Sequence, residues 1–164
     1  MVVDTILFGD CRETLKEFDG KARTCVTSPP YYGLRDYGGE ESQIGQEQTP
    51  EEYIQSLVEV FRSVRDVLTD DGTLWVNIGD SYYNYRPGKG QALPKQTVSK
   101  TKQDLPDKCA KRGNKLEGLK EKDLIGIPWM LAFALRADGW YLRQDIIWHK
   151  PNPMPESVKD RCTK

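Results

Sequence analysis

Apolar and polar residues follow two different periods along this chain of 164 residues. Four short apolar runs rich in β-favouring residues are each followed within three residues by a glycine or proline, and we expect them to be strands: 5–8, 24–27, 73–78 and 141–148. Apolar residues recur at helical spacing in three other segments, which we expect to be helices: 12–18, 50–68 and 128–137.

The helix expected at 50–68 has clear signals at both ends. Thr49 is a suitable N-cap, Pro50 suits the first helical position, and Glu52 would complete a capping box. Asp71-Gly72 is the expected stop before the next strand.

The order strand, helix, strand, helix, strand, helix, strand predicts an α/β sheet with helices on its faces. In such sheets, ligands bind beyond the carboxyl ends of the strands. Polar or turn-forming residues follow three of the expected strands, namely Gly9-Asp10, Ser28-Pro29-Pro30-Tyr31 and Gly79-Asp80. We therefore look for function at these positions.

The length suits one domain spanning 1–164, and its charge is unevenly distributed. The segment 82–122 has 11 basic and four acidic residues, a net +7, whereas the whole chain carries −1. We interpret 82–122 as a basic, flexible insert. It would either contact a polyanion or form a solvated loop, and charge alone does not separate the two.

Several classes of protein are excluded by composition. The four cysteines are scattered without a C-x-x-C pair, and His149 is the only histidine, so we expect neither a zinc site nor a disulfide framework. No apolar run approaches the length of a membrane span, and the amino terminus lacks the pattern of a signal peptide. We expect a cytoplasmic protein with no metal.

The stretch TSPPYY at 27–32 suggests specific chemistry. Proline fixes the backbone, so the Pro29 carbonyl and the Ser28 hydroxyl would form two acceptors aimed at one small region. An aromatic amino group has two N–H donors that match them, and Tyr31 offers a flat face for stacking a planar base. The alternative is a strand-ending turn with tyrosines packed on the surface.

These residues also resemble a known family. TSPPYY resembles the catalytic motif of the DNA amino-methyltransferases, which use S-adenosylmethionine. Three further segments resemble motifs of the circularly permuted, beta-type members: ILFGDCRETLKEF, VLTDDGTLWVNIGD and LRQDIIWHKPNPMPESVKDR. The resemblance implies a Rossmann-like class I methyltransferase sheet with helices on both faces, acting on double-stranded DNA in a bacterium or phage.

The resemblance also implies roles for individual residues. Ser28, Pro29, Pro30 and Tyr31 would grip and stack a base flipped out of the duplex. Asp10 would face the adenosine part of the cofactor, with Ser28 beside it, unless Asp10 only forms a turn. The expected contacts to base or DNA are Tyr32, Trp148, Lys150, Asn152, Lys89, Lys111 and Arg112.

Three of these assignments have competing interpretations. Tyr32 could instead be packing, and Trp148 could be a core aromatic. His149 is our least favoured general base, because it has no identified orienting partner.

Serine at the first position of the motif favours cytosine N4 as the target in this family. Adenine N6 stays open, as do an RNA amino-methyltransferase and a non-catalytic nucleic-acid-binding fragment. An N-P-P-Y motif would have indicated glutamine in a protein substrate, but position 28 is serine.

One family feature is missing from the sequence. No F-x-G-x-G-like loop follows any expected strand, although the family uses such a loop to hold the methionine part of the cofactor. The resemblance then implies an incomplete sheet with a gap between the first two strands. We expect a missing carboxyl-terminal half or a second subunit to supply this loop, and the chain alone to bind the cofactor weakly or not at all.

Overall fold

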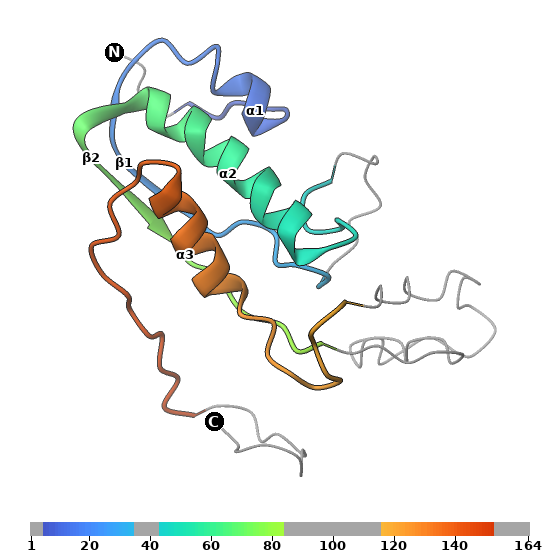
Figure 1. Ribbon diagram of the computed structural model, residues 1–164. Coiled ribbons are helices and arrows are strands. Elements are labelled where there is room, and N and C mark those ends of the chain that lie inside the picture. Colours follow the sequence, from blue (N-terminus) through green and yellow to red (C-terminus); the bar gives the residue numbers. More distant parts are fainter. Residues whose placement is uncertain (1–4, 35–42, 84–115, 153–164) are drawn as a thin grey trace.

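The computed structural model describes residues 5–34, 43–83 and 116–152 (Figure 1). The elements in chain order are α1 (Cys11–Thr14), β1 (Ala22–Thr27), α2 (Pro50–Val67), β2 (Leu68–Val76) and α3 (Ile127–Ala137). No helix within these residues is long and apolar enough to cross a membrane. The mixture of helices with a parallel strand pair fits the expected α/β class, but a full Rossmann-like sheet is not present in this part of the chain.

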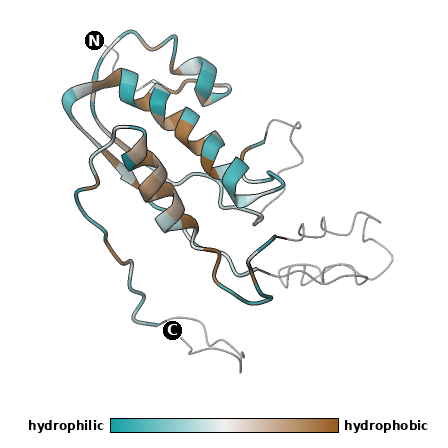
Figure 2. Cartoon of the chain, viewed as in Figure 1, coloured by the Kyte–Doolittle hydropathy of each residue, from teal (hydrophilic) through white to brown (hydrophobic). Residues whose placement is uncertain are grey.

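Helix α2 confirms the sequence prediction, because its signals are local. The Thr49 side chain accepts a hydrogen bond from the Glu52 backbone N–H, and the Glu52 carboxylate accepts one from the Thr49 N–H. This reciprocal capping box satisfies backbone donors that a helix start leaves without partners. Figure 2 shows the resulting amphipathic helix as alternating brown and teal bands along α2.

The end of α2 differs from the prediction. The helix stops at Val67, and β2 begins at Leu68, before Asp71-Gly72. Buried Leu68 takes an extended backbone and pairs with Ala22 of β1. Gly72 instead lies near a shift in the strand register, where a Cβ atom would be only 2.8 Å from the Thr69 carbonyl oxygen.

Strands β1 and β2 run parallel, with Cys25 opposite Leu74 and Val26 opposite Trp75. Cys25, Leu74 and Val76 pack against the core formed with α2 and α3, whereas Val26 and Trp75 are exposed. Among the described residues, α2 and α3 cover one face of the pair, and helices on both faces stay a prediction. The core consists of buried residues from α2, Leu68 and α3: Tyr53, Ile54, Leu57, Val58, Phe61, Val64, Leu68, Ile127, Leu131 and Leu135.

Helices α2 and α3 lie side by side and are joined by charge as well as by the core (Figure 1). Asp138, the C-cap of α3, forms ion pairs with Arg62 and Arg65 of α2. The Arg62 hydrogen bond holds the pKa of Asp138 below its usual value. This contact fixes the carboxyl-terminal end of α3 against α2.

Two of the predicted strands are wrong. Residues 5–8 and 141–148 form no strand, and their large apolar side chains are exposed. A strand requires a neighbour that completes its hydrogen-bond ladder, and the described residues provide none for either segment. The helix predicted at 12–18 is also shorter in the structure, where α1 spans only Cys11–Thr14.

Candidate functional site

The SPPY segment continues directly from β1 at the carboxyl end of the parallel pair. The Asn77 N–H donates a hydrogen bond of 2.9 Å to the Thr27 carbonyl, so the two chains stay paired just before Ser28. Ser28 and Pro30 are exposed, while Pro29 and Tyr31 are partly buried. We call residues 28–31 the elbow.

Buried Tyr53 of α2 fixes the direction of the elbow. Its hydroxyl donates a hydrogen bond of 2.8 Å to the Pro30 carbonyl oxygen. Burial raises the pKa of Tyr53, so this hydroxyl remains a donor at neutral pH. Tyr53 lies on the apolar face of the helix, and no local signal in the sequence reveals this second role.

Ser28 and Pro29 retain free acceptors. Within the described ranges, neither the Ser28 hydroxyl nor the Pro29 carbonyl has a hydrogen-bond partner. The two groups belong to adjacent residues on a backbone restrained by proline on one side and by the β-ladder on the other. As far as the described residues show, the elbow can therefore accept two hydrogen bonds from a ligand without breaking any of its own.

Gly79, just beyond β2, seats the Tyr31 ring. A Cβ atom added at Gly79 would lie 2.9 Å from Tyr31 Cε2, well inside contact distance. Only glycine leaves room for the ring in this position. Gly45, at φ +97°, approaches the elbow from the following loop, where a Cβ would lie 3.2 Å from the Tyr31 carbonyl oxygen. Both close approaches depend on tertiary structure, so the local sequence does not reveal them.

Tyr32 lies against the protein body. Its ring packs on Tyr53 with centroids 5.4 Å apart, and its hydroxyl donates to the Gln48 carbonyl at 3.3 Å. The Ser81 hydroxyl donates to the Tyr32 carbonyl at 3.2 Å. Burial raises the pKa of Tyr32 to about 12. This geometry favours the packing interpretation of Tyr32 over a base contact.

Asp80 links the end of β2 to the start of α3. Its carboxylate accepts hydrogen bonds from the backbone N–H groups of Gly126 and Ile127, each at 3.0 Å, and of Ser81 at 2.9 Å. Gly126 occupies the N-cap position of α3 and has no side chain to cap it. Asp80 supplies this cap from another element, and its negative charge suits the positive end of the helix dipole. The sequence offers one signal for this role: α3 begins after Gly126, which has no side chain to cap the helix itself.

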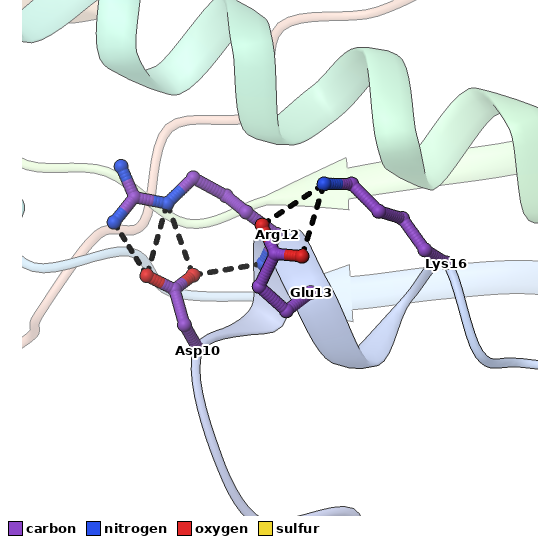
Figure 3. A network of polar contacts seen from close by, with 4 residues as sticks. All are labelled: Asp10, Arg12, Glu13 and Lys16. Carbon is purple, nitrogen blue, oxygen red and sulfur yellow. Dashed lines mark hydrogen bonds and ion pairs between the residues drawn. The ribbon is translucent and has the colours of Figure 1, made fainter.

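Asp10 is engaged locally. It N-caps α1, and its carboxylate pairs with the Arg12 guanidinium (Figure 3). The Arg12 hydrogen bond lowers the pKa of Asp10 to about 2. Within the described part of the chain, no hydrogen bond or ion pair joins Asp10 to the elbow. The turn-forming interpretation accounts for the observed contacts of this residue.

The remaining predicted residues are not brought to the elbow by any described contact. Trp148, Lys150 and Asn152 are exposed in the extended segment that follows α3 (Figure 1). The exposure of Trp148 rules out a core position within the described structure. Lys89, Lys111 and Arg112 lie outside the described residues. No group of side chains with metal-binding potential occurs among the residues that were placed.

The flanks of the segment 84–115 are joined to each other. Tyr82 and Leu124 form an antiparallel bridge, and the Ile125 N–H donates to the Ser81 carbonyl at 3.0 Å. The described residues that flank 84–115 therefore meet next to Asp80, and Ser81 among them also contacts Tyr32 beside the elbow.

In the comparison with known proteins, a family model and individual relatives agree with each other. Residues 22–164 match the N6/N4 family model described as DNA methylase. The chain is 52% identical to the type II methyltransferase M.Cfr9I of Citrobacter freundii, over 98% of this chain and 51% of that protein. It is also 52% identical to M.SmaI of Serratia marcescens, over 97% of this chain and 52% of that protein.

A more distant relative is the type II methyltransferase M.SfiI of Streptomyces fimbriatus, 39% identical over 94% of this chain and 32% of that protein. The chain thus spans about half the length, or less, of these curated relatives. No solved structure matches it.

Proposed function

Because this chain belongs to the N6/N4 family of DNA methylases, we propose that it forms the base-gripping part of a site-specific DNA methyltransferase. The reaction is the transfer of a methyl group from S-adenosylmethionine to the exocyclic amino group of cytosine (N4). The proposal concerns the complete enzyme, of which this chain corresponds to about half the length in its relatives.

The free acceptors of the elbow are the observation that carries the proposal. The Ser28 hydroxyl and the Pro29 carbonyl would accept the two N–H bonds of an amino group, while the Tyr53 hydrogen bond holds the elbow in place. Acceptors that draw the amino hydrogens out of the ring plane localise the nitrogen lone pair for attack. Accurate positioning of this kind lowers the barrier without a covalent intermediate.

Tyr31 would stack on the flipped base. Its ring is held by Gly79 on the protein side and stays partly exposed. Flipping costs a few kcal/mol, which contacts to the DNA backbone can offset. The basic residues Lys89, Lys111 and Arg112, which precede α3 in the sequence, are candidates for those contacts. Exposed Trp148, Lys150 and Asn152, which follow α3, are further candidates.

S-adenosylmethionine supplies an electrophilic methyl group when it is bound. The residues of this chain fit only part of such a site. Ser28 offers one free hydroxyl, whereas the Asp10 carboxylate is occupied by Arg12. We therefore assign most of the cofactor contacts to polypeptide outside this chain, and we expect the chain alone to bind the cofactor weakly.

A chimera tests the proposal directly. This chain would replace its matching half in M.SmaI, and DNA methylated by the chimera would be digested to nucleosides. We expect N4-methylcytosine, and its loss in the Ser28→Ala and Tyr31→Ala variants. Finding only N6-methyladenine would overturn the choice of base.

The second candidate is a non-catalytic DNA-binding fragment. The engaged Asp10 carboxylate is the observation that favours it, since a cofactor contact is then missing. A folded chimera that binds DNA and S-adenosylmethionine but yields no methylated nucleoside would support this candidate against the enzyme.

A further inference from the structure

We infer that Ser81, which follows Asp80 after β2, is a positioning residue for methyl transfer. Its hydroxyl holds the backbone beside Tyr31, and through that backbone it sets the angle of the ring on which the base would stack. The inference deepens the proposed function and rests on it for the reaction, whereas its geometry rests on contacts between described residues.

Two hydroxyl groups hold the carbonyls of the residues on either side of Tyr31. The Tyr53 hydroxyl donates to the Pro30 carbonyl at 2.8 Å. The Ser81 hydroxyl donates to the Tyr32 carbonyl at 3.2 Å, across 49 positions of sequence. Tyr53 belongs to α2, whereas Ser81 follows β2. The backbone around Tyr31 is therefore fixed from two different elements.

The ring of Tyr31 is seated by the same short segment that carries Ser81. Gly79 lies two residues before Ser81, and a Cβ atom at Gly79 would lie 2.9 Å from Tyr31 Cε2. Segment 79–81 thus contacts both the ring of Tyr31 and the backbone that follows it. Because few rotatable bonds separate a tyrosine ring from its backbone, a shift of that backbone tilts the ring.

The backbone of Ser81 is itself held in place. The Asp80 carboxylate accepts a hydrogen bond from the Ser81 N–H at 2.9 Å, and it also accepts from N–H groups at the start of α3. The Ser81 carbonyl accepts from the Ile125 N–H at 3.0 Å. With both backbone groups engaged, the Ser81 hydroxyl has a defined position from which to hold Tyr32.

Kinetics of the M.SmaI chimera test the inference. Ser81→Ala should lower kcat about fivefold or more, as for the loss of one hydrogen bond that positions a reacting group. KM for DNA should stay nearly unchanged, because DNA binding depends largely on phosphate contacts. Ser81→Thr keeps a hydroxyl and should restore most of kcat. Ser81→Cys, whose thiol is a weaker donor, should also lower kcat, and it replaces Ser81→Ala if that variant fails to fold.

Ser56→Ala is the matched control. The Ser56 hydroxyl also donates to a backbone carbonyl, that of Glu52 at 3.1 Å, but this contact lies within α2. We expect Ser56→Ala to leave kcat unchanged. Urea denaturation of both alanine variants would separate a loss of positioning from a loss of stability.

A second measurement does not depend on methyl transfer. The chain would be labelled with 3-fluorotyrosine, and Tyr31→Phe would identify the fluorine NMR resonance of Tyr31 by its disappearance. We expect this resonance to shift in Ser81→Ala and to keep its position in Ser81→Thr and Ser56→Ala.

Three results would overturn the inference: an unchanged kcat in Ser81→Ala, a loss of kcat that Ser81→Thr does not restore, or a Tyr31 resonance that stays in place in Ser81→Ala. If the chimera with unchanged Ser81 transfers no methyl group, the proposed function fails. The fluorine spectra then still decide whether Ser81 positions Tyr31.

Discussion

The hydroxyl of Tyr53 lies 2.8 Å from the carbonyl oxygen of Pro30, so a core residue of α2 directly holds the partly exposed elbow. The hydrophobic core and the candidate site are thereby coupled through a single side chain. The consequences can be measured by removing one atom or one contact at a time.

Tyr53→Phe should lower the free energy of unfolding by about 1 kcal/mol, because one hydrogen bond is lost while the ring still fills the core. Urea denaturation would measure this. In the M.SmaI chimera, the same variant should reduce kcat more than it changes KM for DNA. Tyr141→Phe is the control, since Tyr141 is 87% exposed and should show neither effect.

Gly79→Ala should displace the Tyr31 ring, because the new Cβ would lie 2.9 Å from it. We expect a loss of methylation by the chimera of about tenfold or more, in line with misplacement of a positioning group. The double variant with Tyr31→Ala provides the control, compared by urea denaturation because that background has lost methylation. If Gly79→Ala lowers stability as much without the Tyr31 ring as with it, the steric explanation is wrong.

Asp80→Ala should destabilise the chain by about 1 kcal/mol, the usual cost of losing a helix N-cap. Asp80→Asn should cost less, because its amide oxygen can still accept from the N–H groups of Gly126 and Ile127. Denaturant midpoints would compare the variants. Equal stability of wild type and Asp80→Ala would show that the cap contributes nothing.

The pair between Asp138 and Arg62 should make stability depend on pH. The folded pKa of Asp138 lies below its unfolded value near 3.8, so ionised Asp138 favours folding. This contribution is present above about pH 4 and is lost as the pH falls through the folded pKa. Asp138→Asn should therefore be less stable than wild type at pH 7, and the difference should shrink below about pH 4. A difference that grows in acid would contradict the assignment.

Local signals were sufficient for some elements of this fold and for the position of the elbow. The capping box at Thr49 and Glu52 involves residues within one helical turn, and the proline pair ends β1 by its own chemistry. Both features could therefore be predicted from the sequence, as could the start of α3 beside Pro128.

Other features depend on which segments meet in space. Residues 5–8 and 141–148 have strand-like composition, but composition does not supply a neighbouring strand. The contacts of Tyr53 with Pro30 and of Asp80 with Gly126 span 23 and 46 positions, so no window of sequence reveals them. The assignments of Trp148, Lys150 and Asn152 stay predictions, because they too depend on contacts between segments that are far apart in the sequence.

The bridge between Tyr82 and Leu124 has a practical consequence for protein engineering. It closes the fold on both sides of 84–115 independently of what connects the two ends. Loop-closure entropy grows only slowly with length, so replacing this connection by one of different length costs little free energy. The position is thus a natural point for grafting, where a connection of another length or sequence can be introduced while α3 and Ser28 keep their places.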